Sequence, residues 1–596
     1  MNVLLQVLLP FPVLATLHAA PAMTPAAKPA VSQASGQPPA SPAQAPDLGR
    51  EIDTSLRWLR HAQDPGTGAY GASVEATAWT LRAMILSPRR YQRIDGPFVE
   101  RALQFLAQRQ RADGAIADEG AAEADVVRQT RAAAGALALH ADDTTKDALQ
   151  KALAFVARHG GDAPAFDDPA LPTDPQALVA RVTELLAKRG REGAWDGALG
   201  KVGETARNVN VLVRAWPALK PADSAPPRFQ PLPASEPADP AKVTAAVERG
   251  GRWLAAQADG GKFGAPGRPD AGLTAMAVGA LLAVPKPRPT EVQATIDAGI
   301  AWLVSLQKPD GSIHDGKYAN YATSAAILAL VRHGDPAHAP VIGKARDWLV
   351  ALQVGPEEGY SPDHPYYGGI GYGSSERPDL SNLQFALEAL AASGLPKEDA
   401  AFQRALKFLQ RCQNRSESND IAIPDGGKVV VSGDDGGAAY LPGQSFAGTI
   451  ELEDGRKIAR SYGSMTYALL KGYIFAGLPR EDPRMKAAWS WISKNWTLDV
   501  NPGFQAGADP TAAYQGLYYY FHTMAKALDL YGSEVVVDAQ GKEHRWREEL
   551  AGRVLGLARK VDGAWTNENS PRWQEGNPVL GTAYALLTLE LTRNRP

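Results

Sequence analysis

The chain has 596 residues, which is long for one hydrophobic core and predicts two or more domains. Its 62 Lys and Arg residues nearly balance 65 Asp and Glu residues, and the net charge of -3 excludes a strong field for attracting nucleic acid or an anionic membrane. An apolar content of 44% is typical of a soluble globular protein, and Cys412, the single cysteine, excludes an internal disulfide.

Residues 1–22 are predicted to be a secretory signal peptide. An apolar stretch precedes small residues, and an A-x-A pattern ends at Ala22. A membrane anchor is the alternative, but the apolar run is shorter than the roughly 20 residues that span a bilayer, and it contains Pro10 and Pro12. We therefore expect an exported protein, periplasmic or secreted, with a disordered Ala- and Pro-rich tether at residues 23–48.

A repeat extends over most of the remaining chain. Each clear copy begins with an aromatic and an aliphatic residue, reaches a Gln or another polar residue, passes through a turn with Gly and enters a second apolar helix. Trp302 and Trp348 begin successive copies 46 residues apart, a length that suits one helix hairpin. Clear copies begin at Trp58, Phe105, Trp253, Trp302, Trp348 and Phe408.

The two helices of each repeat are predicted to lie in different layers. The second helix, as in "TSAAILAL", is small and apolar nearly all round, whereas the first is amphipathic. We therefore expect an all-α fold with an inner ring of second helices and an outer ring of first helices. The loops that enter the inner helices meet at one end of such a ring, beside unpaired helix N-H groups, and a functional site is expected there.

A proline-rich stretch at residues 217–240 shows no apolar periodicity and is predicted to be a linker. About four helix hairpins precede it, and about six follow it, enough to close a barrel. We therefore predict an N-terminal helical-repeat domain at residues 49–216 and a C-terminal toroid at residues 241–596.

Two insertions, from Gly426 to Gly463 and from Glu534 to Trp546, alternate as strands do and are predicted to form β-hairpins. Either insertion could cover the rim of the barrel or act as a lid over its cavity. We favour the covering role.

The segments "LQKPDGSI", "REGAW" and "VDGAW" resemble the Q-x(n)-D-G-x-W repeats of the squalene cyclase and prenyltransferase superfamily, over most of residues 50–596. This resemblance implies an α/α toroid whose C-terminal part is similar to the squalene cyclase C-terminal domain. It does not select one function, because the same toroid serves cyclases, protein prenyltransferases, thioester proteins and, in related forms, polysaccharide enzymes.

The position that resembles the cyclase motif D-x-D-D-T reads "DLSNL" here. Asp379 matches the first Asp, whereas Ser381 stands where the resemblance places the proton donor and Asn382 where it places the partner of that donor. A hydroxyl cannot protonate an alkene, so cyclase activity is expected to be lost or altered unless Asp379 or another carboxyl takes over as the catalytic acid. An aspartate before an apolar helix is also an ordinary N-cap, and we favour that role for Asp379.

The reactive sites of the other toroid families are not matched. Cys412 has no Asp two residues earlier, which leaves the zinc ligands of the prenyltransferases incomplete, and no thioester motif is present. His522 resembles the prenyltransferase histidine in its tyrosine-rich setting and is a second candidate catalytic residue, with a hydrogen-bonded wall residue as the alternative. We predict no metal ion and no cofactor.

Aromatic and polar residues near the starts of the inner helices are the candidate ligand-binding residues. Aromatic walls suit a polyisoprenoid or a carbocation, and they equally suit the faces of sugars; plain core packing is the alternative for each tyrosine. The candidates are Tyr321, Tyr366, Tyr367, Tyr372, Asn382, Tyr462, Tyr514, Tyr518, Trp573 and Glu575.

Three functions therefore stay open. The first is a toroid that binds an isoprenoid or another apolar small molecule, with altered or lost cyclase activity; any enzyme activity would be that of a cyclase-like isomerase or lyase. The second is a polysaccharide lyase or hydrolase with a glycan partner. The third is a non-enzymatic scaffold for other proteins.

Overall fold

The computed structural model describes residues 48–593, with gaps at 143, 160–165, 167, 191, 220–230, 266, 317, 374–376, 506–508 and 510. The predicted signal peptide, nearly all of the predicted tether and residues 220–230 of the predicted linker lie outside the described residues. No helix in the described part of the chain is long and apolar enough to cross a bilayer.

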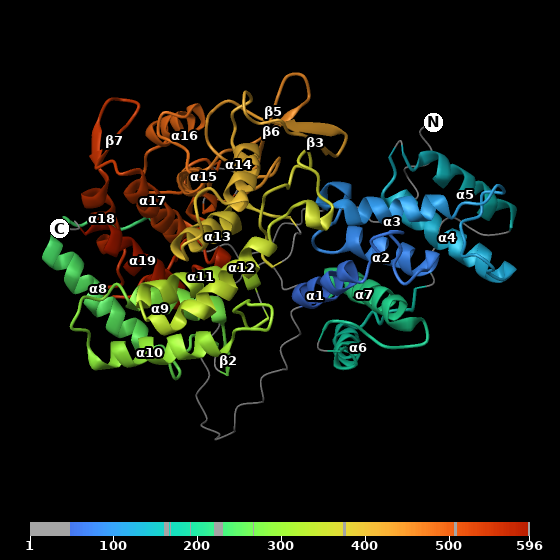
Figure 1. Cartoon of the computed structure of the whole chain (residues 1–596), viewed down its shortest axis with the longest axis horizontal. Helices are drawn as coiled ribbons and strands as arrows, with labels where there is room; N and C mark the ends of the chain where they lie inside the picture. Colours follow the sequence, from blue (N-terminus) through green and yellow to red (C-terminus); the bar gives the residue numbers. More distant parts are fainter. Residues whose placement is uncertain are drawn as a thin grey trace, which may run out of the picture. The chain divides into compact units, whose positions relative to one another are not determined.

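Helices dominate the described chain, as Figure 1 shows, and the predicted all-α fold is confirmed. The N-terminal helices are α1 (Leu48–His61), α2 (Val74–Leu86), α3 (Pro97–Gln108), α4 (Glu123–Leu139), α5 (Lys146–Arg158), α6 (Pro175–Ala187) and α7 (Gly200–Leu219). The C-terminal helices are α8 (Pro240–Ala255), α9 (Ala271–Leu281), α10 (Thr290–Ser305), α11 (Ala319–His333), α12 (Ala339–Ala351), α13 (Leu380–Ala392), α14 (Ala400–Cys412), α15 (Gly463–Phe475), α16 (Pro483–Lys494), α17 (Leu517–Tyr531), α18 (Trp546–Gly556) and α19 (Pro578–Thr592).

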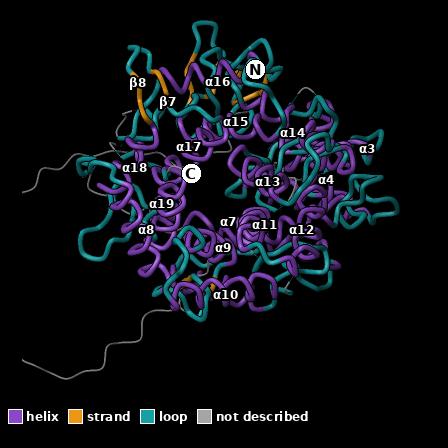
Figure 2. The backbone as a smooth tube through the Cα atoms, turned by 60° about the vertical axis from the view of Figure 1, so that its left-hand side comes forward, coloured by secondary structure: helices purple, strands orange, loops and turns teal. Residues whose placement is uncertain are grey.

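The C-terminal helices form the predicted closed toroid. Each of the inner helices α9, α11, α13, α15, α17 and α19 contacts the next one, and α19 returns to contact α9. Figure 2 shows these helices around a common axis, with α8, α10, α12, α14, α16 and α18 outside them. The layers follow from the sequence, because every residue of α9 is buried, whereas only one side of α10 is.

Helices α1–α7 have a hydrophobic core of their own, which extends from Leu48 to Ala215, and the core of the toroid extends from Val243 to Leu591. In the N-terminal group α2 contacts both α4 and α7, which makes it the central helix. Helix α7 continues through Pro217 to Leu219, so the predicted linker begins inside this helix. The exact domain boundaries stay predictions.

A glutamine after several of the outer helices joins one repeat to the next. The side-chain amide of Gln353 donates to the carbonyl oxygen of Gly368 in its own turn and to that of Ala401 in α14, both at 2.9 Å. An amide NH₂ group suits this position because it carries two N-H donors. Equivalent pairs of hydrogen bonds are made by Gln63, Gln110, Gln307 and Gln413.

A threonine in the first turns of an inner helix holds the loop that leads into that helix. Thr323 Oγ1 accepts a hydrogen bond from the backbone N-H of Ile313 at 3.0 Å, and Thr274 does the same for Phe263 at 2.9 Å. The glutamine fixes one side of the Gly-containing turn and the threonine fixes the other. The loops therefore enter the inner helices along a repeated path and meet at one end of the ring.

The strands are short. They are β1 (Gly264–Ala265), β2 (Arg268–Pro269), β3 (Ala422–Asp425), β4 (Lys428–Val431), β5 (Thr449–Glu451), β6 (Lys457–Ala459), β7 (Val535–Val537) and β8 (Glu543–Arg545). β7 and β8 form the second predicted hairpin. The first insertion forms one sheet in the order β3-β4-β6-β5, with β4 and β6 parallel. Its first strand lies before the predicted start at Gly426, and as an edge strand it tolerates Pro424, which made it look unlike a strand.

Candidate ligand-binding site

A cavity of about 320 Å³ opens at the end of the toroid where the inner helices begin. All six inner helices, or the loops just before them, contribute to its wall, as the sequence predicted for a functional site. Its aromatic lining residues are Tyr318, Tyr321, Tyr372, Tyr440, Phe446, Tyr462, Tyr519, Trp573 and Tyr584. Its polar lining residues are Asp270, Ser381, Asn382, Ser464, Gln574 and Glu575.

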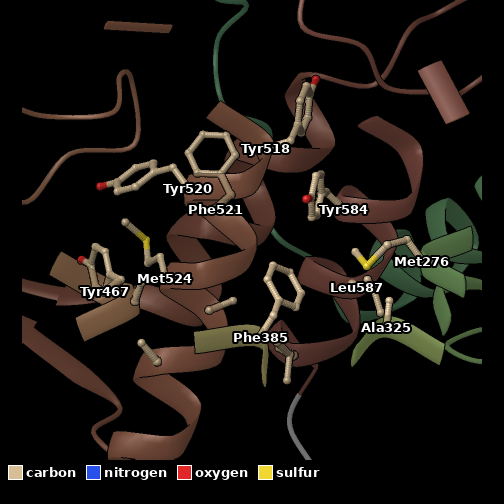
Figure 3. Close-up of a cluster of buried hydrophobic side chains, with 14 of the residues drawn as sticks. Met276, Ala325, Phe385, Tyr467, Tyr518, Tyr520, Phe521, Met524, Tyr584 and Leu587 are labelled. Carbon is tan, nitrogen blue, oxygen red and sulfur yellow. The ribbon is translucent and has the colours of Figure 1, made fainter. Parts of the chain in front are cut away.

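Six of the predicted ligand-binding residues line this cavity: Tyr321, Tyr372, Asn382, Tyr462, Trp573 and Glu575. The other four, Tyr366, Tyr367, Tyr514 and Tyr518, are not among its lining residues. Tyr366 is 1% exposed and packs against His364. Tyr518 is 2% exposed and lies beside Phe521 in the buried cluster of Figure 3. These two tyrosines pack in the core, which was the alternative to a ligand-binding role.

The structure adds aromatic residues that the sequence did not single out. Tyr440 and Phe446 come from the loop between β4 and β5, inside the first insertion, and their rings lie 4.5 Å apart between centroids. The insertion therefore supplies part of the cavity wall, and the interpretation as a rim cover alone was incomplete. Tyr584 was missed because the pattern of α19 is apolar nearly all round, so no residue of that helix stood out.

Asp379 is the N-cap of α13. Its Oδ1 accepts from the backbone N-H of Asn382 and its Oδ2 from the Asn382 side chain, both at 2.8 Å. The carboxyl group is 1% exposed and is not part of the cavity lining, whereas Asn382 and Tyr440, which hydrogen-bond to it, are. Burial raises the pKa of Asp379 to about 6, although these hydrogen bonds oppose the rise.

Hydroxyl groups gather at Ser381, the position to which the sequence resemblance assigns a proton donor. Ser381 Oγ and the Tyr519 hydroxyl lie 2.9 Å apart, and the Gln384 amide donates to the same hydroxyl at 3.2 Å. Asp379 behind them holds its proton more tightly than an exposed aspartic acid does, which makes it a weaker acid.

Glu575 is the buried carboxyl group that does line the cavity. It is 1% exposed, and it accepts hydrogen bonds from the backbone N-H of Tyr519 and from the Asn567 amide, both at 2.8 Å. The N-cap of α17 is Gly516, which has no side chain to cap the helix, so Glu575 satisfies a free N-H group from outside the helix. Burial raises the pKa of Glu575 to about 7 despite these donors.

The rim of the cavity is built on strained backbone. Trp573, Gln574 and Tyr318 adopt positive φ angles of 56°, 64° and 41°. Such angles are unfavourable for residues other than glycine and commonly occur at binding sites, where the surrounding structure enforces them. The Arg572 guanidinium lies 5.1 Å from the centroids of both Phe446 and Trp573 and holds this rim from outside.

We expect Glu575→Gln to remove a pH-dependent loss of stability. The folded pKa is raised above the ordinary value of 4.5 to about 7, so the stabilising effect of the bound proton is complete below about pH 4.5 and is lost as the pH rises through about 7. Glutamine stays neutral. The difference in free energy of unfolding between the variant and the wild type should shift in favour of the variant by about 1–2 kcal/mol from about pH 5.5 to about pH 8.

Urea unfolding at these two pH values would measure that shift. Glu568→Gln, a change at an exposed residue of the same loop, is the matched control and should show no such trend. If the difference in free energy of unfolding between Glu575→Gln and the wild type does not change with pH, the raised pKa of Glu575 is contradicted.

A second cavity, of about 460 Å³, lies at the opposite end of the ring axis and is lined by the later turns of the inner helices. His522 lines it, so the two candidate catalytic residues are not brought together at one cavity. Burial lowers the pKa of His522 to about 3, which keeps the ring neutral, and the ring lies 5.7 Å from that of Tyr584 between centroids. This placement fits a wall residue, but Nδ1 of His522 is buried without a hydrogen-bond partner among the described residues.

An aromatic layer lies between the two cavities. The hydroxyls of Tyr321 and Tyr584 are 3.0 Å apart, and Phe385 packs edge-on against Tyr321 with 5.0 Å between centroids. Phe385 and Tyr584 both appear in Figure 3, among side chains of the buried cluster. Tyr321 and Tyr584 line the first cavity, and Phe385 lines the second. Two separate cavities therefore lie along the axis of the ring, with the aromatic layer between them.

Residues 268–422 match the family model of the squalene-hopene cyclase C-terminal domain. The comparison with curated proteins found no match. A solved type II terpene cyclase from Scytonema, in complex with geranylgeranyl dihydroxybenzoate, is 14% identical with a TM-score of 0.36, and the match covers 59% of this chain and 97% of that chain. The ent-copalyl diphosphate synthase from Streptomyces platensis is 15% identical with a TM-score of 0.31, over 82% of this chain and 100% of that chain.

The matched residues 268–422 extend from the start of α9 to the end of α14 and include Asp379. They form half of a closed ring in which glutamines join successive helix pairs. This part of the chain is therefore similar to the squalene-hopene cyclase C-terminal domain.

Proposed function

We propose that the toroid binds an isoprenoid or a similarly apolar small molecule in the aromatic cavity and does not start a cyclisation by protonating it. The observation that carries this proposal is the aromatic lining, which continues onto the surface at the rim. Tyr318, Phe446 and Trp573 are 51%, 39% and 38% exposed. Large exposed aromatic side chains gathered around one opening favour an apolar ligand.

The polar groups of the cavity are few and fixed. The Tyr519 hydroxyl is held by Ser381 and Gln384, and Glu575 is held by backbone and by Asn567. A mostly apolar pocket with a few convergent polar groups suits a ligand with one polar end, such as a prenyl alcohol. No histidine or arginine is among the described residues that line the cavity, which does not favour the alternative of a polysaccharide lyase.

Saturable binding of a prenyl alcohol should depend on Trp573 and not on aromatic residues elsewhere. Geranylgeraniol, squalene and a hopanoid are added to the purified protein, with a uronic-acid oligosaccharide for comparison, and binding is followed by thermal shift and by calorimetry. We expect Trp573→Ala to weaken the binding of geranylgeraniol about 10-fold or more, since the indole provides a large contact area. Tyr519→Phe should weaken the binding of a prenyl alcohol more than the binding of squalene, because only the alcohol can form a hydrogen bond with the Tyr519 hydroxyl.

Tyr367→Phe is the matched control, because Tyr367 is partly buried and does not line the cavity. It should leave the affinity unchanged. Absence of saturable binding across the three apolar compounds would contradict the proposal, and so would equal affinity of the wild type and Trp573→Ala. If the wild type converts squalene to a cyclic product, the proposal that the toroid does not start a cyclisation by protonation is wrong.

A further inference from the structure

We propose that His333, Asp335 and His338 form a binding site for a divalent transition-metal ion of the Zn²⁺ type. The three residues stand in the segment "HGDPAH", which ends α11 and begins α12. None of them lines either axial cavity, so the site is independent of the proposed ligand-binding function. It contrasts with the prediction from the sequence that no metal ion is bound.

The ligand atoms are already close together. One nitrogen of each histidine and one carboxylate oxygen of Asp335 all lie within 4.8 Å of one another. The two imidazole rings are 5.5 Å apart between centroids. Two ligands of one zinc ion, at bond lengths of 2.0–2.1 Å, can be at most about 4.2 Å apart. Small side-chain rotations would therefore complete the coordination.

Both histidines keep a nitrogen without a partner. Nδ1 of His333 and Nδ1 of His338 are buried, and neither has a hydrogen-bond partner within the described residues. A buried polar atom without a partner is unfavourable, so two such atoms side by side call for an explanation. A bound cation would satisfy both at once.

The turn at the end of α11 brings the three proposed ligands together. Gly334 ends α11 in the left-handed conformation with a φ of 80°, which turns the chain back and places Asp335 and His338 beside His333. One oxygen of Asp335 accepts from the backbone N-H of Ala337 at 2.9 Å, and its other oxygen is the metal ligand that we assign.

The kind of ligand atom selects the kind of metal. Two imidazole nitrogens and one carboxylate suit Zn²⁺, Ni²⁺ or Cu²⁺, whereas Mg²⁺ and Ca²⁺ prefer sites made of oxygen alone. On the other ring nitrogen of His333, the carboxylate of Asp297 lies 4.0 Å from Nε2. Metal-bound histidines commonly face such a carboxylate, which orients the ring. Three protein ligands leave a fourth position of a tetrahedral ion for water.

Metal binding is tested on the full-length protein without a polyhistidine tag, after treatment with EDTA. We expect calorimetry with Zn²⁺ to give one tight site per chain. His333→Gln and His338→Gln should each weaken it about 100-fold, and Asp335→Ser about 10-fold, because serine keeps an N-cap oxygen but removes the carboxylate. His61→Gln, at an exposed histidine on α1, should bind as the wild type does.

Electron paramagnetic resonance of the Cu²⁺-loaded protein is a second measurement and should show coupling to two nitrogens, reduced to one in either histidine variant. Thermal unfolding in EDTA shows whether each variant is folded. Absence of tight Zn²⁺ binding to the wild type would overturn the proposal. Binding that survives both single histidine substitutions would overturn it as well.

Discussion

Replacing Lys471 with methionine is expected to lower the free energy of unfolding by about 3–5 kcal/mol. Lys471 Nζ lies 2.6 Å from Glu388 Oε2, and the two side chains are 2% and 10% exposed. Burial alone would raise the pKa of Glu388, but Lys471 and Lys526 hold it below its usual range, so the carboxylate is charged at neutral pH. The methionine side chain would fill the space of the lysine and leave that charge facing Lys526 alone, at 2.9 Å.

A double-mutant cycle separates this cause from a general packing defect. Removing both charges, in Lys471→Met with Glu388→Leu, should recover much of the loss, because a buried ion pair is often replaced by apolar residues at little cost. Lys151→Met is the matched control, since its partner Asp147 is 77% exposed, and it should change the free energy of unfolding by less than about 1 kcal/mol. Urea unfolding at neutral pH measures these variants beside the wild type. A small effect of Lys471→Met would show that the pair is not ionised in the folded protein.

Gln353→Leu is expected to destabilise the toroid by about 2–5 kcal/mol. The leucine cannot donate to the carbonyl oxygens of Gly368 and Ala401, so two buried acceptors lose their donor. The same substitution removes the acceptor of the Arg404 guanidinium, which donates to Gln353 Oε1 at 2.8 Å. The turn cannot rearrange easily, because Gly368 lies so close to the backbone of Arg404 that a Cβ there would be 1.8 Å from its carbonyl oxygen.

Gln104→Leu is the matched control for this substitution. Gln104 is exposed on α3 and bonds only to Glu100 one turn away, so its loss should cost less than about 0.5 kcal/mol. Thermal and urea unfolding would compare the two variants. Equal losses of stability in the two variants would mean that the hydrogen bonds of Gln353 do not stabilise the contact between repeats.

The ring and the end at which its cavity opens could be predicted from the sequence, because both depend on local patterns. The spacing of Gln and Gly sets where each helix pair turns, and the apolar second helices have to lie inside. The position of Asp379 before an apolar helix likewise predicted its capping role, which the structure confirms.

The residues of the cavity wall could not all be predicted, because a pattern of residue types does not show where a long loop runs or which way a side chain points. Tyr440 and Phe446 reach the cavity through the path of a long insertion, and Tyr584 looks like any core residue of an apolar helix. Tyr366 and Tyr518 carry the same side chain as Tyr372, and only the direction in which each one points separates packing from lining. The export signal stays a proposal that rests on residues 1–22 alone.

The contact between α19 and α9 makes the last described helix a neighbour of one of the first helices of the toroid. An open array of repeats has two end units, which can fray while the middle stays folded. A closed ring has no such units, and every hairpin has a neighbour on both sides. The C-terminal helix is therefore as indispensable as any in the middle, and loss of one hairpin would expose two flanks at once.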